Sequence, residues 1–72
     1  MKKISKNQSI KVNKIYALAL ENHEKNNFKT ALNLYQDILK IDPYHASSYY
    51  NLGLVFQRLR EFNKAKDFYK KA

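Results

Sequence analysis

The sequence predicts an all-α fold of four helices arranged as two antiparallel hairpins. Apolar residues recur along most of the chain at the three- and four-residue spacing of amphipathic helices. One glycine and one proline in 72 residues leave few tight turns, which disfavours sandwiches and barrels. The sequence also matches itself at an offset of 34 residues. The connections are short, so consecutive helices must pack antiparallel.

The first expected helix covers residues 10–25 and follows a flexible polar leader over residues 1–9. Its apolar stripe begins at Ile10 and continues through Ile15 and Leu18. That spacing is typical of an amphipathic helix with one face packed on a neighbour.

The second expected helix covers residues 28–41. Asn26 and Asn27 precede it, and asparagine favours turns because it tolerates left-handed backbone. Asp42 and Pro43 end the helix, since proline disfavours the helical conformation in the residue before it.

The third and fourth expected helices cover residues 45–59 and 62–72. The only glycine, Gly53, lies in the middle of the third apolar run. A glycine inside a helix costs roughly 1 kcal/mol relative to alanine. Either the helix breaks at Gly53 or another group approaches the backbone there. The apolar spacing continues through Gly53 without a shift, which favours the close approach.

The offset of 34 residues pairs residues 12–38 with residues 46–72, and six of the 27 pairs are identical. Tyr16 aligns with Tyr50, and Tyr35 aligns with Tyr69. A helix-turn-helix unit that repeats every 34 residues is typical of a tetratricopeptide array.

The second unit resembles the tetratricopeptide repeat family closely. The family's aromatic, leucine, glycine and aromatic in the first helix correspond to Tyr49, Leu52, Gly53 and Phe56. Its alanine, aromatic and alanine in the second helix correspond to Ala65, Tyr69 and Ala72. The resemblance implies a short right-handed α-solenoid, with one repeat over residues 10–43 and an incomplete repeat over residues 44–72. It also implies that Gly53 lies where the two helices of the second hairpin cross.

The first unit departs from the family pattern. Ile15 replaces the first aromatic, Ala19 replaces the glycine and Asn22 replaces the second aromatic. Terminal repeats are often atypical because one of their faces meets solvent.

In this family the first helices of successive repeats line a concave groove that holds a peptide or helix of a partner. The resemblance therefore implies a non-enzymatic protein–protein interaction module, a scaffold or adaptor segment. By register, the first helix contributes Asn13, Tyr16, Ala17, Leu20 and His23 to this groove. The second repeat contributes Ser47, Tyr50, Asn51, Leu54, Gln57 and Arg58.

Asn51 matches an asparagine that chaperone-binding members of the family use to clamp a terminal carboxylate. Tyr16 and Leu20 stand where that clamp has a lysine and an asparagine. The remaining basic residues of the clamp belong to a third repeat. A carboxylate clamp is therefore not expected.

The sequence predicts no enzyme, no cofactor and no metal. There is no cysteine, and one glycine cannot make a glycine-rich phosphate loop. His23 and His45 lie on different expected helices, with no second ligand at helical spacing. Ordinary surface or turn histidines fit this pattern better than metal ligands.

The formal charge is +8, from 14 basic and 6 acidic residues. It permits an acidic peptide, nucleic acid or anionic membrane as partner, although a solvated lysine-rich surface is the preferred explanation. The alternative function is a nucleic-acid-binding helical repeat. Its phosphate contacts would come from Lys64, Lys66, Lys70 and Lys71 with Arg58 or Arg60.

Such arrays usually need about three repeats to bury enough apolar surface, and this chain has about two. Self-association through the exposed repeat ends is therefore expected. No apolar run approaches the roughly 18 residues that cross a bilayer. The first residues are basic, but no hydrophobic signal segment follows them. The expected location is intracellular, in the cytoplasm.

Overall fold

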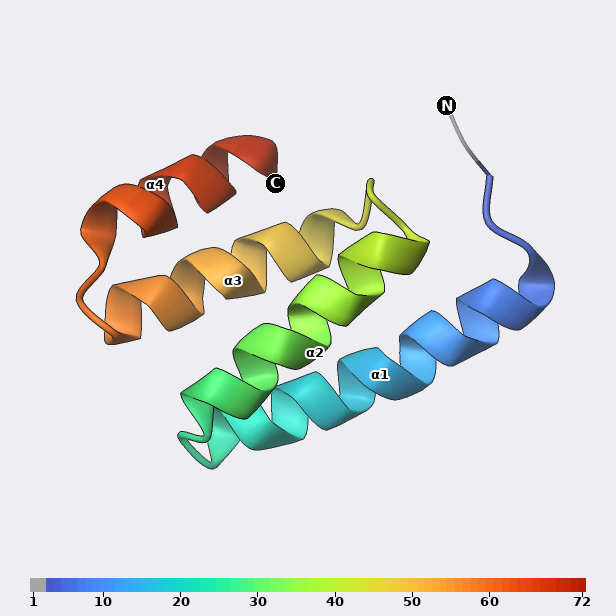
Figure 1. The fold of residues 1–72 in the computed structure, drawn as a ribbon, viewed down its shortest axis with the longest axis horizontal. Helices are drawn as coiled ribbons and strands as arrows, with labels where there is room; N and C mark the ends of the chain where they lie inside the picture. Colours follow the sequence, from blue (N-terminus) through green and yellow to red (C-terminus); the bar gives the residue numbers. More distant parts are fainter. Residues whose placement is uncertain (1–2) are drawn as a thin grey trace.

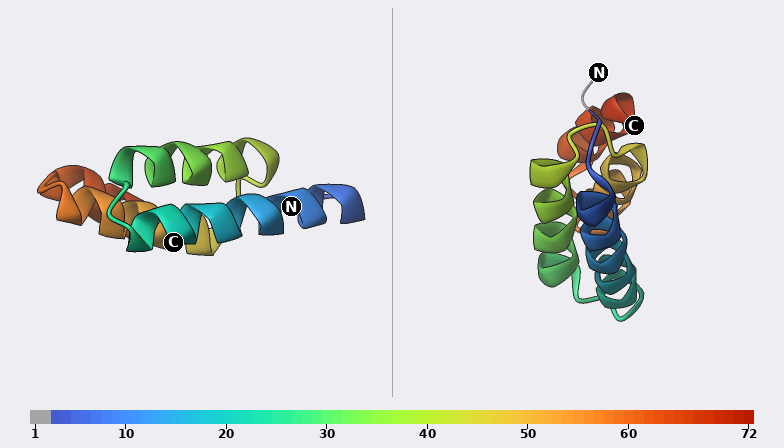
Figure 2. Two further views of the ribbon diagram at one scale, coloured as in Figure 1. Left: turned by 90° about the horizontal axis from the view of Figure 1, so that it is seen from below. Right: turned by 90° about the vertical axis from the view of Figure 1, so that its right-hand side faces the viewer.

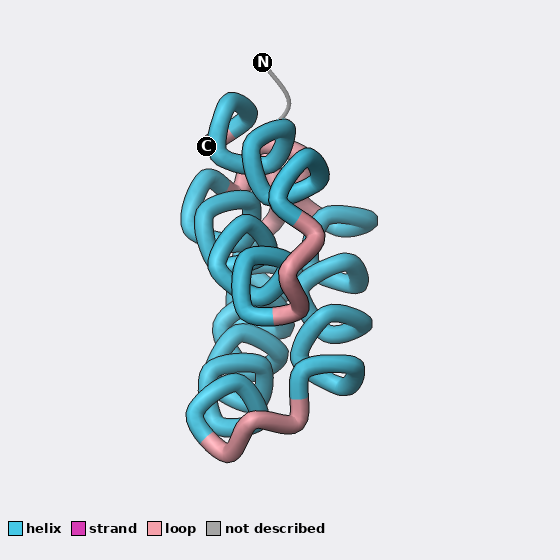
Figure 3. The backbone as a smooth tube through the Cα atoms, turned by 90° about the vertical axis from the view of Figure 1, so that its left-hand side faces the viewer, coloured by secondary structure: helices cyan, strands magenta, loops and turns pink. Residues whose placement is uncertain are grey.

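A computed structural model describes residues 3–72 and contains four helices, drawn in Figure 1. They are α1 (Lys6–Glu24), α2 (Phe28–Ile41), α3 (Ala46–Arg58) and α4 (Phe62–Lys71). Short loops connect them, and the described residues contain no strand (Figure 3). The prediction of an all-α fold is confirmed.

The helices form two hairpins that meet through their middle members. α1 packs on α2, α3 packs on α4, and α2 packs on α3. Figure 2 shows α1 and α3 on one side of the molecule and α2 on the other. The molecule extends 36 × 26 × 13 Å along its principal axes. The shortest extent corresponds to two helix layers, since packed helix axes lie about 8–10 Å apart.

The start of α1 differs from the sequence prediction. The side chain of Ser5 accepts a hydrogen bond from the backbone N–H of Gln8 (3.1 Å), and the side chain of Gln8 accepts one from the backbone N–H of Ser5 (2.9 Å). This reciprocal capping satisfies two N–H groups that a helix start leaves unpaired. α1 therefore begins at Lys6, and the prediction of a flexible leader is wrong for residues 6–9. Residues 1–2 of that leader lie outside the described residues.

The other helix bounds agree with the predictions to within one residue. His45 caps α3, because its side chain accepts a hydrogen bond from the backbone N–H of Ser48 (3.2 Å). The turns inside the two hairpins share one backbone geometry: Asn26 and Arg60, which are 34 positions apart, both have φ of 64°. Asparagine adopts this conformation readily, whereas Arg60 does so without that preference. The repeat therefore persists in the backbone where the residue type differs.

The core lies between α2 and the two helices beside it. Its fully buried large side chains are Tyr35, Ile38, Leu52 and Val55. On α1 the buried residues are Val12 and Ala19. The stripe expected from the sequence is wrong at two positions, because Ile10 and Leu18 are 47% and 50% exposed. Apolar residues surround much of α1, so their spacing did not fix which face packs on α2.

The close approach at Gly53 is confirmed. A Cβ atom on Gly53 would lie 2.5 Å from Cε1 and 2.6 Å from Cδ1 of Tyr69. The ring of Tyr69 on α4 thus occupies the space that a side chain on α3 would need. The equivalent position in the first hairpin is Ala19, which is fully buried. The cost of glycine in α3 is therefore offset by close packing of the second hairpin.

Candidate functional site

Side chains of α1 and α3 meet around a shallow hollow of about 460 Å³. Its lining residues are Tyr16, Leu20, Ala46, Ser47, Tyr50, Asn51 and Ala72. Tyr16 and Leu20 come from α1, and four of the others come from α3. The hollow therefore brings together five of the eleven groove residues expected from the sequence, and they come from both repeats.

A polar contact joins the two helices beneath this hollow. The amide nitrogen of Asn51 donates to the hydroxyl of Tyr16 and to the backbone carbonyl of Ser47, each at 2.9 Å. Asn51 is only 8% exposed, so its amide is held in a fixed orientation. The ring of Tyr16 also lies 5.3 Å from the imidazole ring of His45, measured between ring centroids. These contacts hold α1 and α3 in register.

Tyr50 is the exposed aromatic side chain of this surface. It is 52% exposed, and its ring centroid lies 5.8 Å from that of Tyr69. The ring of Tyr50 therefore faces outward. Leu20 is partly buried and adds an apolar wall from α1. The hollow thus combines aromatic and aliphatic surface with the polar pair of Tyr16 and Asn51.

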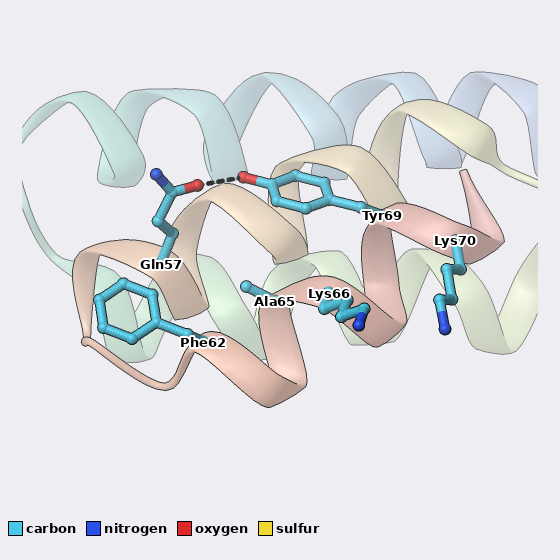
Figure 4. Close-up of a pocket in the computed structure, with 6 residues that line it drawn as sticks. All are labelled: Gln57, Phe62, Ala65, Lys66, Tyr69 and Lys70. Carbon is cyan, nitrogen blue, oxygen red and sulfur yellow. Dashed lines mark hydrogen bonds between the residues drawn. The ribbon is translucent and has the colours of Figure 1, made fainter.

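Three of the expected groove residues, His23, Gln57 and Arg58, lie outside this hollow. The side-chain oxygen of Gln57 accepts a hydrogen bond from the hydroxyl of Tyr69 (2.6 Å), beside a separate hollow on α4 (Figure 4). The guanidinium of Arg58 lies 5.3 Å from the ring centroid of Phe28 on α2. His23 lies on α1, and its ring packs against Phe28 and Tyr35 of α2. The remaining expected residues, Asn13, Ala17 and Leu54, do not line the hollow.

His23 belongs to an aromatic cluster. Its Nδ1 atom lies 3.2 Å from the hydroxyl of Tyr35, within hydrogen-bond distance. Its ring meets those of Phe28 and Tyr35 edge-on, at centroid distances of 6.0 Å and 6.1 Å. This contact could not be predicted from helical periodicity, because His23 and Tyr35 lie on different helices. The geometry assigns His23 to the packing of the first hairpin.

Burial shifts the pKa values of this cluster. Burial lowers the pKa of His23 below 6.5, the positive charge of Arg58 lowers it further, and Glu24 opposes both effects. Burial also raises the pKa of Tyr35 to about 12, with smaller contributions from Tyr16 and Glu24. Both groups are therefore held in their neutral forms.

We expect the lowered pKa of His23 to make stability depend on pH. Above pH 6.5 the imidazole is neutral in the folded and the unfolded chain, so it contributes no pH dependence. As the pH falls through 6.5, the unfolded chain takes up a proton that the folded chain resists, and the free energy of unfolding decreases. Urea unfolding at about pH 7.5 and about pH 5.5 measures this decrease.

A His23→Gln variant should lose this part of the pH dependence. A His45→Asn variant is the matched control, because it keeps His23 and supplies another good capping residue. NMR titration of the His23 imidazole gives a direct check. A midpoint at or above 6.5 would contradict the burial described here.

Two other features are absent from the residues that the structure describes. No cluster of three or more histidine, aspartate or glutamate side chains within residues 3–72 has the arrangement of a metal site. Over that range no helix has the length and apolar character needed to cross a bilayer.

Comparison with known families gives one match. Residues 19–59, more than half of the chain, match the family described as TPR repeat. The matched region runs from the end of α1 through α2 and α3, so it includes the contact between the two hairpins. No curated protein matches the chain significantly.

Proposed function

Because the chain belongs to the tetratricopeptide repeat family, whose repeats are generally protein–protein interaction modules, we propose that it binds a peptide segment of a partner protein between α1 and α3. The observation that carries this proposal is the hollow lined by both helices. Figure 2 shows these two helices on the side of the molecule away from α2.

The chemistry of the hollow suits a peptide backbone. Asn51 uses its amide nitrogen for two internal bonds, which leaves its side-chain oxygen to accept from a ligand N–H. Tyr16 accepts the bond from Asn51, which leaves its O–H to donate to a ligand carbonyl. Leu20 and Tyr50 supply apolar surface for the ligand's side chains. Aromatic side chains of this kind often dominate binding energy at interfaces.

Three other kinds of partner can be compared with a peptide: a terminal carboxylate, a nucleic acid and a second copy of the chain. For a carboxylate clamp, Tyr16 lacks the positive charge of the clamp's lysine, and Leu20 lacks the amide of its asparagine. The alternative of phosphate contacts through lysines predicts a steep loss of affinity as salt increases, whereas a contact built on Tyr50 and Leu20 predicts a small one. The sequence also predicts self-association through the exposed repeat ends, where Phe62 on α4 is 56% exposed, but contact between two such ends would bring the lysines beside Phe62, Lys66 and Lys70, against each other.

We expect Tyr50→Ala to weaken peptide binding roughly tenfold without unfolding the chain. Peptides selected from a random display library against the 72-residue chain are the probe, and isothermal titration gives their affinities. NMR shifts on peptide addition should concentrate at the hollow between α1 and α3. Circular dichroism should show little loss of helicity, because the ring is more than half exposed.

Tyr44→Ala is the matched control. Tyr44 is 63% exposed and lies in the turn before α3, outside the hollow. It should leave peptide affinity unchanged. Equal losses in the two variants would mean that exposed tyrosines bind these peptides nonspecifically. A large loss of stability in Tyr50→Ala would move the site elsewhere.

A further inference from the structure

The outer face of α4 has a second hollow, of about 350 Å³. It is lined by Gln57, Phe62, Ala65, Lys66, Tyr69 and Lys70. Figure 4 shows Gln57 reaching from α3 to Tyr69, with the other residues along α4. Five of the six lie on α4 at spacings of three and four residues, so they form one face of that helix.

The equivalent face of α2 shows what this face lacks. Phe62 and Tyr69 on α4 correspond to Phe28 and Tyr35 on α2, 34 positions earlier. α3 packs on α2, where Arg58 covers Phe28 and Tyr35 is fully buried. By contrast, Phe62 is 56% exposed and Tyr69 is only partly buried. α4 thus repeats the aromatic residues of a face that, on α2, packs against a helix.

The charge of the α4 face differs from that of α2. Lys66 replaces Leu32, and Lys70 replaces Gln36. Within residues 3–72, neither lysine lies within ion-pair distance of a carboxylate. The two lysines are four residues apart, so they lie about 6 Å apart along the helix axis and project from the same side. The face therefore offers an apolar strip beside a pair of uncompensated positive charges.

We propose that the outer face of α4 binds an amphipathic helix of a partner protein that carries two carboxylates one turn apart. Its apolar stripe packs on Phe62 and on the part of the Tyr69 ring that α3 leaves exposed. Its carboxylates pair with Lys66 and Lys70. This surface shares no lining residue with the hollow between α1 and α3.

A second copy of the chain fits this face less well. Two α4 faces in contact would bring Lys66 and Lys70 against the same lysines of the partner copy. On α1 the exposed Leu18 lies one turn from Lys14 and one turn from Glu21, and the carboxylate of Glu21 is already paired with Lys25 (2.9 Å). Each copy carries a charge of +8. Charge complementarity therefore favours an acidic helix over self-association.

The test uses the 72-residue chain and two synthetic helical peptides. Each peptide has about 18 residues, enough for appreciable helicity, with leucines in a single helical stripe. In the first, two glutamates flank the stripe at positions i and i+4. In the second, lysines replace these glutamates. NMR shifts should locate the glutamate peptide on α4, and the lysine peptide should bind at least roughly tenfold more weakly.

A charge-reversed protein separates this contact from general attraction. In the Lys66→Glu/Lys70→Glu variant, the lysine peptide should become the tighter ligand. Lys11→Glu/Lys14→Glu on α1 is the matched control, because it makes the same change in net charge. The control should keep the preference for the glutamate peptide. Equal effects of the two double variants would overturn the proposal.

The oligomeric state and the binding of nucleic acid give two further checks. Sedimentation of the chain alone should give a constant mass near 8.6 kDa. A dimer that dissociates in Phe62→Ser would identify a second copy as the occupant. Binding of an oligonucleotide through Lys66 and Lys70, with no binding of the glutamate peptide, would assign the face to nucleic acid.

Discussion

Tyr35→Ala is expected to leave the chain unfolded or nearly so at 25 °C. Tyr35 is fully buried on α2, and its ring centroid lies 6.1 Å from those of Tyr16 and His23. Removing a buried aromatic ring costs about 3–5 kcal/mol through lost burial and the cavity left behind. A core in a chain this short rarely supplies more than about 3–5 kcal/mol in total. Circular dichroism should therefore show a loss of helicity and no cooperative melt.

Two further variants test whether the loss of stability comes from the buried ring of Tyr35. Tyr35→Phe keeps the ring and loses only the hydroxyl near His23, so it should cost about 0.5–1.5 kcal/mol. Tyr69→Ala changes the equivalent residue in the second hairpin, where the ring is only partly buried, and should cost less than Tyr35→Ala. If Tyr69→Ala were as damaging as Tyr35→Ala, the core would not be centred on α2.

Gly53→Leu is expected to lower the free energy of unfolding by about 1–3 kcal/mol. A leucine there must displace the ring of Tyr69, because even its Cβ would lie 2.5 Å from Cε1. For a domain of this size, such a loss lowers Tm by roughly 4–20 °C. Thermal melts of the variant and the parent at equal concentration measure the change.

A double-mutant cycle tests whether Tyr69 causes this loss. When Tyr69 is first replaced by alanine, Gly53→Leu should cost much less, because the space of the ring is then open. Ala19→Gly is the matched control in the first hairpin. It should cost about 1 kcal/mol, since α1 accommodates a Cβ at this position and a helix disfavours glycine. An unchanged Tm in Gly53→Leu would disprove the packing explanation of Gly53.

The sequence predicted the fold well where local signals and the repeat agreed. α2 begins after Asn27 and ends before Pro43, as expected. The start of α1 was missed although its signal is in the sequence: Ser5 followed three residues later by Gln8 is a capping box. The packed face of α1 was partly wrong, because Leu18 and Ala19 are both apolar and only one of them lies against α2.

The candidate site was predictable where a residue's direction follows from the repeat. Tyr16 and Tyr50 occupy equivalent positions, and both line the hollow. Gln57 and Arg58 were harder to place, because they lie near the end of α3, where contacts with α2 and α4 determine their directions. Arg58 lies over Phe28, and Gln57 bonds to Tyr69. Helical periodicity does not predict such contacts between residues on different helices.

The order of the helices in space has a consequence for motion. α2 and α3 each pack on two neighbours, whereas α1 and α4 each pack mainly on one. In such a linear stack, local opening costs least at the ends, because an end helix gives up a single interface when it detaches. Transient detachment of α4 would uncover Gly53 and the α3 surface around it while the first hairpin stays formed. Solvent would then reach the residues around Gly53 through fluctuations of the native state, without global unfolding.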